Sequence, residues 1–389
     1  MNTLSSTDFI KIAQGTAHHF GFSSLDAIAR PLRTQRQSVV PKASMADRRL
    51  DALQGNLTGG ITTYFEQSLH DDKPVLFFST YEVPKTKEVA FALQVVGVKK
   101  SIAESLLIQT LRSLVRDLGY ESHCVRINSI GDHDSVTRYT RELTLYLKKR
   151  LEGMPPQARE IMKDDVIAAF LYLTEMNHEL CAKSPSPLEY LSDASRRHFR
   201  EIIEHLDMTE TPYEIDPRFV GHNHCYGDTL FALELRDEND AILPNAPLTI
   251  RGGRLDSYVG HILKLDVPAT SAVVILNSKK APARMPRPLR YSAPSVFMVQ
   301  LGFGPKIRSL MLLDALKTAS ISVHQALVSD SLGEQLRQAE SYNVPFSIIL
   351  GQKEFVENSI IVRDMRSRSQ QNIPFDSLIP HLKRLLKRV

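Results

Sequence analysis

The sequence is poor in cysteine and has no long apolar run, and each absence excludes a class of protein. Its three cysteines, Cys124, Cys181 and Cys225, lie far apart and form no CxxC pair. That spacing supports neither a disulfide framework nor a zinc ribbon, so we expect reduced thiols. No stretch approaches the roughly 18 consecutive apolar residues of a membrane span, and residues 1–9 show no signal-peptide pattern. The sequence therefore predicts a cytoplasmic protein without a membrane span.

A proline-rich basic segment divides the chain. Residues 279–294, KKAPARMPRPLRYSAP, contain four prolines and five basic residues but no acid. This composition resists both helix and sheet and indicates a semi-rigid linker. Because 389 residues are many for one domain, we predict a core domain at 1–278, the linker at 279–294 and a second domain at 295–389.

Charge is distributed unevenly over these parts. Residues 295–389 carry 12 Lys and Arg against eight Asp and Glu, so a chain with a net charge of +4 and a basic linker has an acidic core. An acidic core beside a basic linker and domain is what contact with an RNA backbone would favour. A solvated linker beside a mildly basic surface explains the same distribution.

The hydrophobic pattern differs between the two predicted domains. Beyond residue 295, apolar runs alternate with helical segments, which predicts a compact α/β unit with a mostly parallel sheet. Before residue 278, strands at 75–78 and 89–98 follow each other like a hairpin, and 101–118 and 158–175 have helical spacing. We therefore predict an α+β core built on an antiparallel sheet.

Three segments of the core resemble segments of histidyl-tRNA synthetases. INSIGD at 127–132 resembles the INSIGD-type segment of that family, RGGRLD at 251–256 resembles GGGRYDGL, and CYGDTLF at 225–231 resembles YYxxTVFE. The last domain, from FMVQLG to IPFDSL, resembles the family's anticodon-binding domain. The resemblance implies an α+β class II synthetase-like antiparallel sheet core with helices, plus a C-terminal α/β anticodon-binding-like domain, and a homodimer.

At the positions that match the family's catalytic arginines, this chain has other residues. Positioned guanidinium groups stabilise the negative charge that develops on the α-phosphate when an aminoacyl adenylate forms. The resemblance places Thr80 at the motif 2 arginine, Ser278 at the motif 3 arginine and Asp228 at an arginine before TVFE. Lys279 or Lys280 could replace the motif 3 arginine, although lysine lacks the planar fork. We expect no catalytic residue and no cofactor, with ATP and magnesium needed only if synthetase activity is retained.

Other matched residues could still line a pocket for a small amino-acid-like or nucleotide ligand. They are Glu82, Tyr226, Gly252, Gly253, Arg254 and Asp256. Adjacent glycines let a backbone approach a ligand closely. The alternative is that the glycines form a turn at the edge of a strand, with Arg254 paired to Asp256 or a neighbour.

Two further patterns favour structural roles. His222, His224 and Cys225 are metal-ligand types, but ligands so close on one extended segment rarely reach the same ion, so we predict no metal site. The LGFGPK loop at 301–306 places glycines before a helix but lacks the full phosphate-binding pattern. We expect it to be a strand-to-helix connection.

These observations favour a non-catalytic histidyl-tRNA synthetase paralogue that binds tRNA or another RNA, with no membrane or DNA contact expected. The candidate phosphate contacts are Arg284, Arg287, Arg290, Arg363, Arg366, Arg368, Lys383, Arg384, Lys387 and Arg388. The alternatives are a divergent active histidine–tRNA ligase, a regulatory subunit of ATP phosphoribosyltransferase and a scaffolding dimer. That regulatory subunit typically lacks an anticodon domain, so residues 295–389 argue against it.

Overall fold

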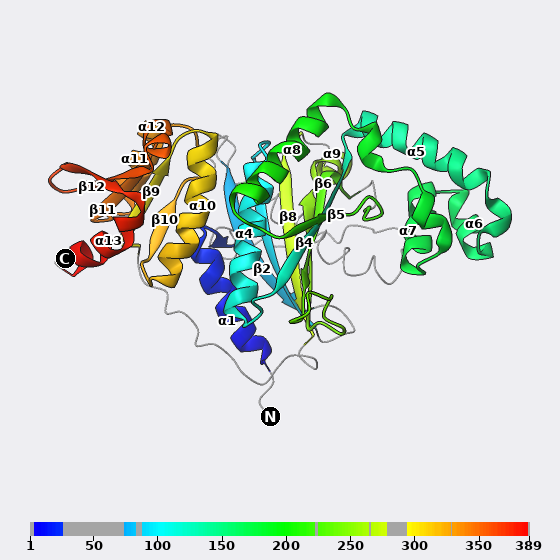
Figure 1. Cartoon of the computed structure of the whole chain (residues 1–389), viewed down its shortest axis with the longest axis horizontal. Coiled ribbons are helices and arrows are strands. Elements are labelled where there is room, and N and C mark those ends of the chain that lie inside the picture. Colours follow the sequence, from blue (N-terminus) through cyan, green and yellow to red (C-terminus); the bar gives the residue numbers. More distant parts are fainter. Residues whose placement is uncertain are drawn as a thin grey trace.

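The computed structural model describes residues 4–25, 74–82, 88–221, 225–263, 266–277, 294–327 and 329–387. Within them the chain forms an eight-stranded sheet followed by a five-stranded sheet. Figure 1 shows the second sheet and its helices on one side of the first. In the described ranges no helix combines the length and apolarity that crossing a bilayer requires.

The core sheet is mixed, with an antiparallel centre. Its strands are β1 (Ser23–Ser24), β2 (Val75–Glu82), β3 (Val89–Val96), β4 (His123–Gly131), β5 (Tyr213–Ile215), β6 (Gly227–Leu235), β7 (Leu248–Arg254) and β8 (Ala269–Leu276). They lie in the order β1-β2-β3-β8-β7-β6-β4-β5. Only the outermost pairings, β1 with β2 and β4 with β5, are parallel. The predicted antiparallel arrangement is confirmed for the six strands between them.

Helices cover one face of this sheet, which we call the back face. They are α1 (Ser6–His19), α4 (Ile102–Asp117) and α8 (Asp193–Met208). Apolar residues recur along α4 with helical spacing and form one buried cluster with alternate residues of β3, Phe91, Leu93 and Val95. Helix α1 begins at Ser5, whose hydroxyl caps it, and α8 begins in the same way at Ser192. The back face is therefore the main core of the molecule.

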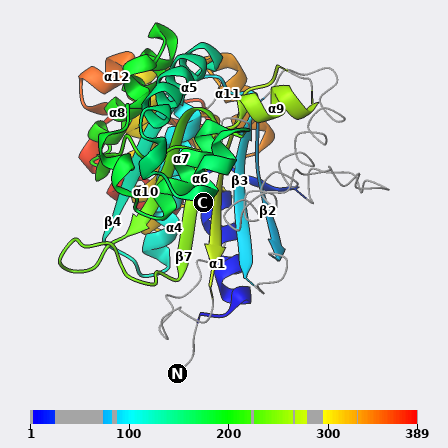
Figure 2. The same ribbon diagram turned by 90° about the vertical axis from the view of Figure 1, so that its right-hand side faces the viewer.

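The opposite face of the sheet, which we call the front face, is covered in part by α5 (His133–Lys148), α6 (Pro156–Met162) and α7 (Val166–Glu175). Figure 2 views the molecule from the side of these helices. The single helix predicted over 158–175 is wrong at its centre. Asp165 leaves the helical conformation and caps α7, its carboxylate accepting hydrogen bonds from the backbone N–H groups of Ile167 and Ala168. Aspartate favours this position because it satisfies helix donors that otherwise lack partners.

The C-terminal sheet is half parallel. Its strands are β9 (Val296–Gln300), β10 (Val323–Gln325), β11 (Phe346–Leu350), β12 (Ser359–Asp364) and β13 (Gln370–Pro374). In the order β10-β9-β11-β12-β13, the first two pairings are parallel and the last two antiparallel. The prediction of a mostly parallel sheet is wrong because connections 351–358 and 365–369 are too short for parallel crossovers, which need about a dozen residues.

Helices cover both faces of the C-terminal sheet. They are α10 (Phe303–Thr318), α11 (Leu332–Ser341), α12 (Gln352–Val356) and α13 (Leu378–Leu386). Helices α10 and α13 share a cluster on one face, and α11 packs on the other. As predicted, the loop at 301–306 connects β9 to α10, and Gly302 adopts φ 98°, a conformation open mainly to glycine. The remaining elements are α9 (Asp256–Leu263) and the short 3₁₀ turns Leu151–Gly153, Glu179–Lys183, Pro187–Tyr190 and Phe375–Ser377.

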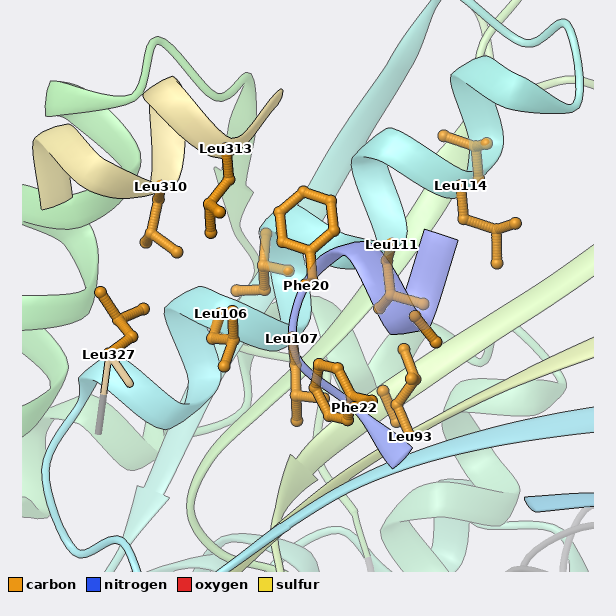
Figure 3. Packing of buried hydrophobic residues seen from close by; sticks show 14 of the residues in the cluster. Phe20, Phe22, Leu93, Leu106, Leu107, Leu111, Leu114, Leu310, Leu313 and Leu327 are labelled. Carbon is orange, nitrogen blue, oxygen red and sulfur yellow. The ribbon is translucent and has the colours of Figure 1, made fainter. Parts of the chain in front are cut away.

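One hydrophobic cluster runs through both domains. Figure 3 shows Leu310 and Leu313 of α10 beside Phe20, which follows α1, and Leu106 and Leu111 of α4. Figure 1 accordingly places α1 and α4 between the core sheet and α10. The C-terminal domain is therefore packed on the back of the core through shared apolar side chains.

Buried polar contacts reinforce this packing. The Lys317 ammonium of α10, 5% exposed, donates to the hydroxyls of Thr16 and Ser113 and to the carboxylate of Asp117. His19 Nε2 donates to the Leu313 carbonyl oxygen at 2.7 Å, which requires that nitrogen to carry a hydrogen. Every donor of the buried ammonium is thus matched by core residues.

Candidate functional site

The RGGR stretch forms the end of β7, in the middle of the core sheet between β6 and β8. Successive residues of a strand face opposite sides, so Arg251 and Gly253 face the front and Gly252 and Arg254 face the back. The alternative of a turn at a strand edge is therefore wrong for Gly252 and Gly253. A Cβ on Gly252 would lie 2.4 Å from the Phe231 ring, and one on Gly253 would lie 2.8 Å from the Tyr226 ring. The glycines are needed because two aromatic rings press on the strand from its two faces.

On the back face, every N–H group of the Arg254 side chain has a hydrogen-bond acceptor. Arg254 is only 1% exposed. Nε and Nη2 donate to the two carboxylate oxygens of Glu104 at 2.7 and 2.8 Å. The other donors reach the carbonyl oxygens of Val98 and Lys100 at 3.2 and 3.4 Å and the Asp256 carboxylate at 3.4 Å. Since a guanidinium has five N–H groups, Arg254 retains no donor for a ligand.

Glu104 also holds His198 of α8, whose Nε2 donates to the carboxylate at 2.8 Å. Burial by itself would raise the pKa of Glu104, but the charges of Arg254 and His198 lower it below its usual range. Burial would likewise lower the pKa of His198, whereas the Glu104 charge raises it. The three side chains form a buried ionic group in which each charge has a partner, the condition under which burying charge is tolerated.

Two of the three expected arginine positions fall within the described residues, and these two lie far apart. Thr80 is exposed on β2. Asp228 lies on β6, four strands away in the sheet order, or about 19 Å at the usual strand spacing. Its backbone adopts φ 48° beside a register shift, and its carboxylate accepts a hydrogen bond from the Ser195 hydroxyl at 2.5 Å. Ser278, with Lys279 and Lys280, lies outside the described residues.

The predicted pocket residues are also divided between places. Tyr226 is buried against Gly253 on the front face, whereas Gly252 and Arg254 belong to the back. Glu82 is exposed at the end of β2, opposite Val89. Val89 lies opposite Leu276, and Leu276 opposite Leu248 at the far end of β7. The structure therefore does not place Glu82 beside Tyr226 and Gly253.

A row of residues across the front face carries polar groups that sequence reasoning missed. The strand registers align six residues, which are Asn128, Leu230, Gly253, Ser271, Gln94 and Phe77. Gln94 is completely buried, and both its amide atoms lack a hydrogen-bond partner. Asn128 donates to the Phe219 carbonyl at 2.9 Å, but its amide oxygen has no partner. A buried polar group without a partner costs on the order of 1–3 kcal/mol, so this row needs an explanation.

The neighbouring rows of the front face show the same feature. The hydroxyls of Ser79 and Tyr81 are buried and have no partner. Burial raises the pKa of the Tyr81 phenol far above its usual value, which keeps it protonated and able to donate. One residue in the sequence could have indicated these buried polar groups: Gln94 is a single amide inside the otherwise apolar strand VAFALQVV.

Arg251 and Arg126 approach the Phe219 ring of the front face. The guanidinium carbon of Arg126 lies 4.5 Å from the ring centroid and that of Arg251 lies 5.9 Å from it. Arg126 is paired with Glu234 at 3.0 Å and with Asp216 at 3.6 Å. Arg251 is exposed and has no hydrogen-bond or ion-pair partner in the described part of the chain.

The candidate RNA contacts within the described residues lie on the C-terminal domain. Arg363 is half-buried on β12, and Arg366 and Arg368 are exposed in the turn after it. Lys383, Arg384 and Lys387 are exposed on or just after α13. Figure 1 shows α13 and β12 at the end of the molecule away from the core sheet. The linker arginines Arg284, Arg287 and Arg290, together with Arg388, lie outside the described residues.

Within the ranges that the structure describes, no group of three or more His, Cys, Asp or Glu side chains could hold a metal ion. Cys225 is buried at the start of the segment before β6. His222 and His224 lie outside those ranges, so the expectation that this stretch binds no metal stays a prediction.

Comparison with known proteins gives relatives for both parts of the chain. Residues 308–385 match the family described as "Anticodon binding domain". The histidine–tRNA ligase of Geobacillus sp. (strain WCH70) is 25% identical over 303 residues, covering 77% of this chain and 70% of the relative. The histidine–tRNA ligase of Dehalococcoides mccartyi (strain CBDB1) is 26% identical over 302 residues, covering 76% and 70%.

Two solved structures resemble this one more loosely. Apo histidyl-tRNA synthetase of S. aureus aligns with a TM-score of 0.45 and 17% identity, covering 82% of this chain and 80% of that one. A Bacillus halodurans protein described as an ATP phosphoribosyltransferase regulatory subunit/histidyl-tRNA synthetase aligns with a TM-score of 0.42 and 13% identity, covering 90% and 96%.

Over about three quarters of its length the chain is similar to histidine–tRNA ligases, and its C-terminal part matches an anticodon-binding domain. The chain is histidyl-tRNA synthetase-like, and the resemblance drawn from its motifs is confirmed to that extent.

Proposed function

We propose that this chain is a histidyl-tRNA synthetase paralogue that binds tRNA or another RNA and does not activate an amino acid. The observation that carries the proposal is that all the hydrogen-bond donors of Arg254 are occupied within the protein. This arginine of the RGGRLD segment spends all five N–H groups on Glu104, Asp256 and two carbonyls. It therefore has nothing to offer the phosphates of ATP.

The charges carried by the strands of the core sheet support the loss of adenylate formation. Two positions expected to hold arginine carry Thr80 and Asp228. Arg126 is already paired with acids, which leaves Arg251 as the arginine near Tyr226 and Phe219 without an acidic partner among the described residues. Removing one positioned donor from a transition state costs about 3 kcal/mol, or roughly 100- to 1,000-fold in rate. Two such losses reduce turnover to a negligible level.

The C-terminal domain supports RNA as the partner. It matches an anticodon-binding family, and its exposed cations Arg366, Arg368 and Lys383 lie away from the core. The cations on the opposite side are used internally, since Lys317 is bound by Asp117 and Lys306 lies 2.5 Å from Asp330. The outer basic surface is thus available for phosphates, with tRNA as the preferred RNA and a homodimer as the assembly.

Two assays on the same preparation test this proposal. We expect no histidine-dependent ATP–pyrophosphate exchange, measured against an active histidine–tRNA ligase as the positive control. We expect filter binding of bulk tRNA that weakens steeply with added salt, because phosphate contacts release counterions. Exchange comparable with the control would instead identify an active histidine–tRNA ligase. No tRNA binding at low ionic strength would reject RNA as the partner and favour a scaffolding dimer.

A further inference from the structure

The C-terminal half of α4 carries a positive charge that neither RNA binding nor the loss of adenylate chemistry requires. We propose that Arg112 and Arg116 of this helix bind a small tetrahedral oxyanion such as inorganic phosphate, on the helix-covered back of the core. This site goes beyond the proposed function and would remain if the RNA proposal failed, because it involves none of the candidate RNA contacts.

Arg112 makes its hydrogen bonds with neutral groups alone. Nε donates to Nε2 of His123 at 3.3 Å, and Nη1 donates to the Thr211 hydroxyl at 2.6 Å. Nη1 also donates to the amide oxygen of Gln109 at 3.1 Å and to the carbonyl oxygen of Thr209 at 3.3 Å. Among the residues that the structure describes, no acid pairs with Arg112, and Nη2 has no acceptor. Because a guanidinium stays charged in proteins, this half-buried side chain lacks a counter-ion.

The histidine beside Arg112 responds to the same excess of positive charge. Burial and, after it, the charges of Arg112 and Arg116 lower the pKa of His123 to about 4. Above that pH the imidazole is neutral, and its Nε2 can accept the hydrogen bond from Arg112. Burial lowers the pKa of Arg112 itself, the Arg116 charge lowers it further, and Asp314 opposes this only in part. A bound anion would stabilise both guanidinium groups.

Arg116 follows Arg112 by four residues, so the two side chains lie on one face of α4 with their Cβ atoms about 6 Å apart. Nη2 of Arg116 donates to the Asp314 carboxylate of α10, whose other oxygen accepts from the Ser113 hydroxyl at 2.9 Å. Nε of Arg116 is buried without an acceptor, and within the described ranges Nη1 has none either. Two guanidinium groups thus share one carboxylate, and one net positive charge remains between them.

The position of the free donors determines the class of ligand. They are Nη2 of Arg112 with Nε and Nη1 of Arg116, so the ligand must accept hydrogen bonds from two side chains on successive helical turns. A tetrahedral oxyanion presents oxygens in several directions, whereas a planar carboxylate matches the edge of one guanidinium. The nearby carboxylates of Asp314 and Asp117 would repel the further charges of a polyphosphate. Inorganic phosphate is therefore the probe that fits these groups best.

Calorimetric titration of the full chain with inorganic phosphate tests the site. Sodium chloride at equal ionic strength is the reference, since phosphate also stabilises proteins generally by exclusion from their surface. We expect saturable binding, competition by sulfate, and at least tenfold weaker binding in Arg112→Gln, which leaves only one guanidinium. Arg337→Gln is the matched control, because Arg337 is exposed on α11, and it should bind phosphate as wild type does.

Arg116→Gln provides a second variant, because Arg112→Gln also removes a hydrogen bond to the Thr209 carbonyl at the end of α8 and so changes stability. The Arg116 side chain is 33% exposed, and its loss should weaken phosphate binding at least tenfold as well. If Arg112→Gln does not fold, Arg116→Gln decides the test.

Filter binding of tRNA separates a free oxyanion from a phosphate of an RNA backbone. Arg112→Gln should leave the salt dependence of tRNA binding as in wild type, since the site takes a free anion. The proposal is overturned if phosphate shows no saturable binding or if a folded variant at either arginine binds it as tightly as wild type. A lower salt slope for tRNA in Arg112→Gln would also overturn it, by assigning Arg112 to the RNA contact.

Discussion

Arg251 and Arg254 stand three residues apart on β7, and the strand turns them to opposite faces of the core sheet. Arg254 is 1% exposed and uses all five N–H groups within the protein. Arg251 is exposed, with no ion pair in the described ranges. Identical side chains on one strand thus have different roles, because a charge satisfied by buried partners belongs to the architecture whereas an unsatisfied one can serve a ligand.

The comparison extends to the two faces as a whole. On the back face, Lys317 meets three core residues and joins the C-terminal domain to α1 and α4. On the front face, Gln94, Asn128, Ser79 and Tyr81 all have buried polar atoms without partners. The front face thus has unpartnered polar atoms in its central rows, whereas the buried ammonium on the helix side has a partner for every donor.

The sharpest test of the comparison is Arg254→Met. It leaves the Glu104 carboxylate buried without its main partner, which typically costs 3–5 kcal/mol, so we expect about that loss of unfolding free energy in urea denaturation. Arg251→Gln should change stability by less than about 0.5 kcal/mol. Adding Glu104→Leu to Arg254→Met should restore part of the loss, because no uncompensated charge then remains. Equal effects of the two single substitutions would break the distinction between the faces.

A smaller effect is expected from Lys317→Met at the contact between the domains. It removes a buried ammonium from Asp117 and two hydroxyls, and we expect a loss of about 2–3 kcal/mol. Wild-type protein should unfold in one calorimetric transition, since the two domains share one cluster, and the variant should show two. Lys353→Met is the control, because Lys353 is 76% exposed on α12. A single, unshifted transition in Lys317→Met would contradict tight docking.

The free energy of unfolding should fall gradually in acid, because histidines that are buried in their neutral form must take up protons. Burial lowers the pKa of His19, His123, His205 and His324 to about 4. The unfolded chain binds these protons near pH 6.5, so their contribution is complete above that pH and stability falls as pH drops from about 6.5 to 4. Urea unfolding across this range measures the slope, which His19→Gln should reduce. The same slope in wild type and variant would show that His19 does not remain neutral.

The smallest effects concern the outer surface of the C-terminal domain. Arg366→Gln and Arg368→Gln should each reduce the slope of log binding constant against log salt by up to about 0.9 in tRNA binding, since each removes at most one phosphate contact. Stability should not change. Arg337→Gln on α11 tests the other face of that sheet and should leave the slope as in wild type. If Arg337 matters equally, the basic surface near α13 is not the specific contact.

Local features were predictable wherever the signal lies within one element. Strands β2 and β3 and helix α4 followed from the spacing of apolar residues, and the loop at 301–306 was placed correctly between β9 and α10. The helix predicted over 158–175 failed because Asp165 caps a new helix. The last sheet is only half parallel, because the connections after β11 and β12 are too short for parallel crossovers.

The candidate site was only partly predictable. The sequence singled out Tyr226, Gly253 and Arg254, but it assigned them with Glu82 to one pocket, and the strand registers separate these residues. The partner of Arg254 is Glu104, 150 residues earlier, and no local pattern connects them. Gln94 was visible as a polar residue in an apolar strand, but its lack of a partner depends on everything packed around it.

The sequence by itself determined the class of the protein, because motif order, the proline-rich segment and hydrophobic periodicity are properties of neighbouring residues. The tertiary structure decided which charged side chains are paired within the protein and which remain unpaired. Ionic satisfaction depends on which strands pair and which face a side chain occupies, and a shift of one residue moves every side chain of a strand to the other face. Alternation along β7 turns Arg251 and Arg254 to opposite faces, but only the packing of the helices and neighbouring strands decides which of them meets buried partners.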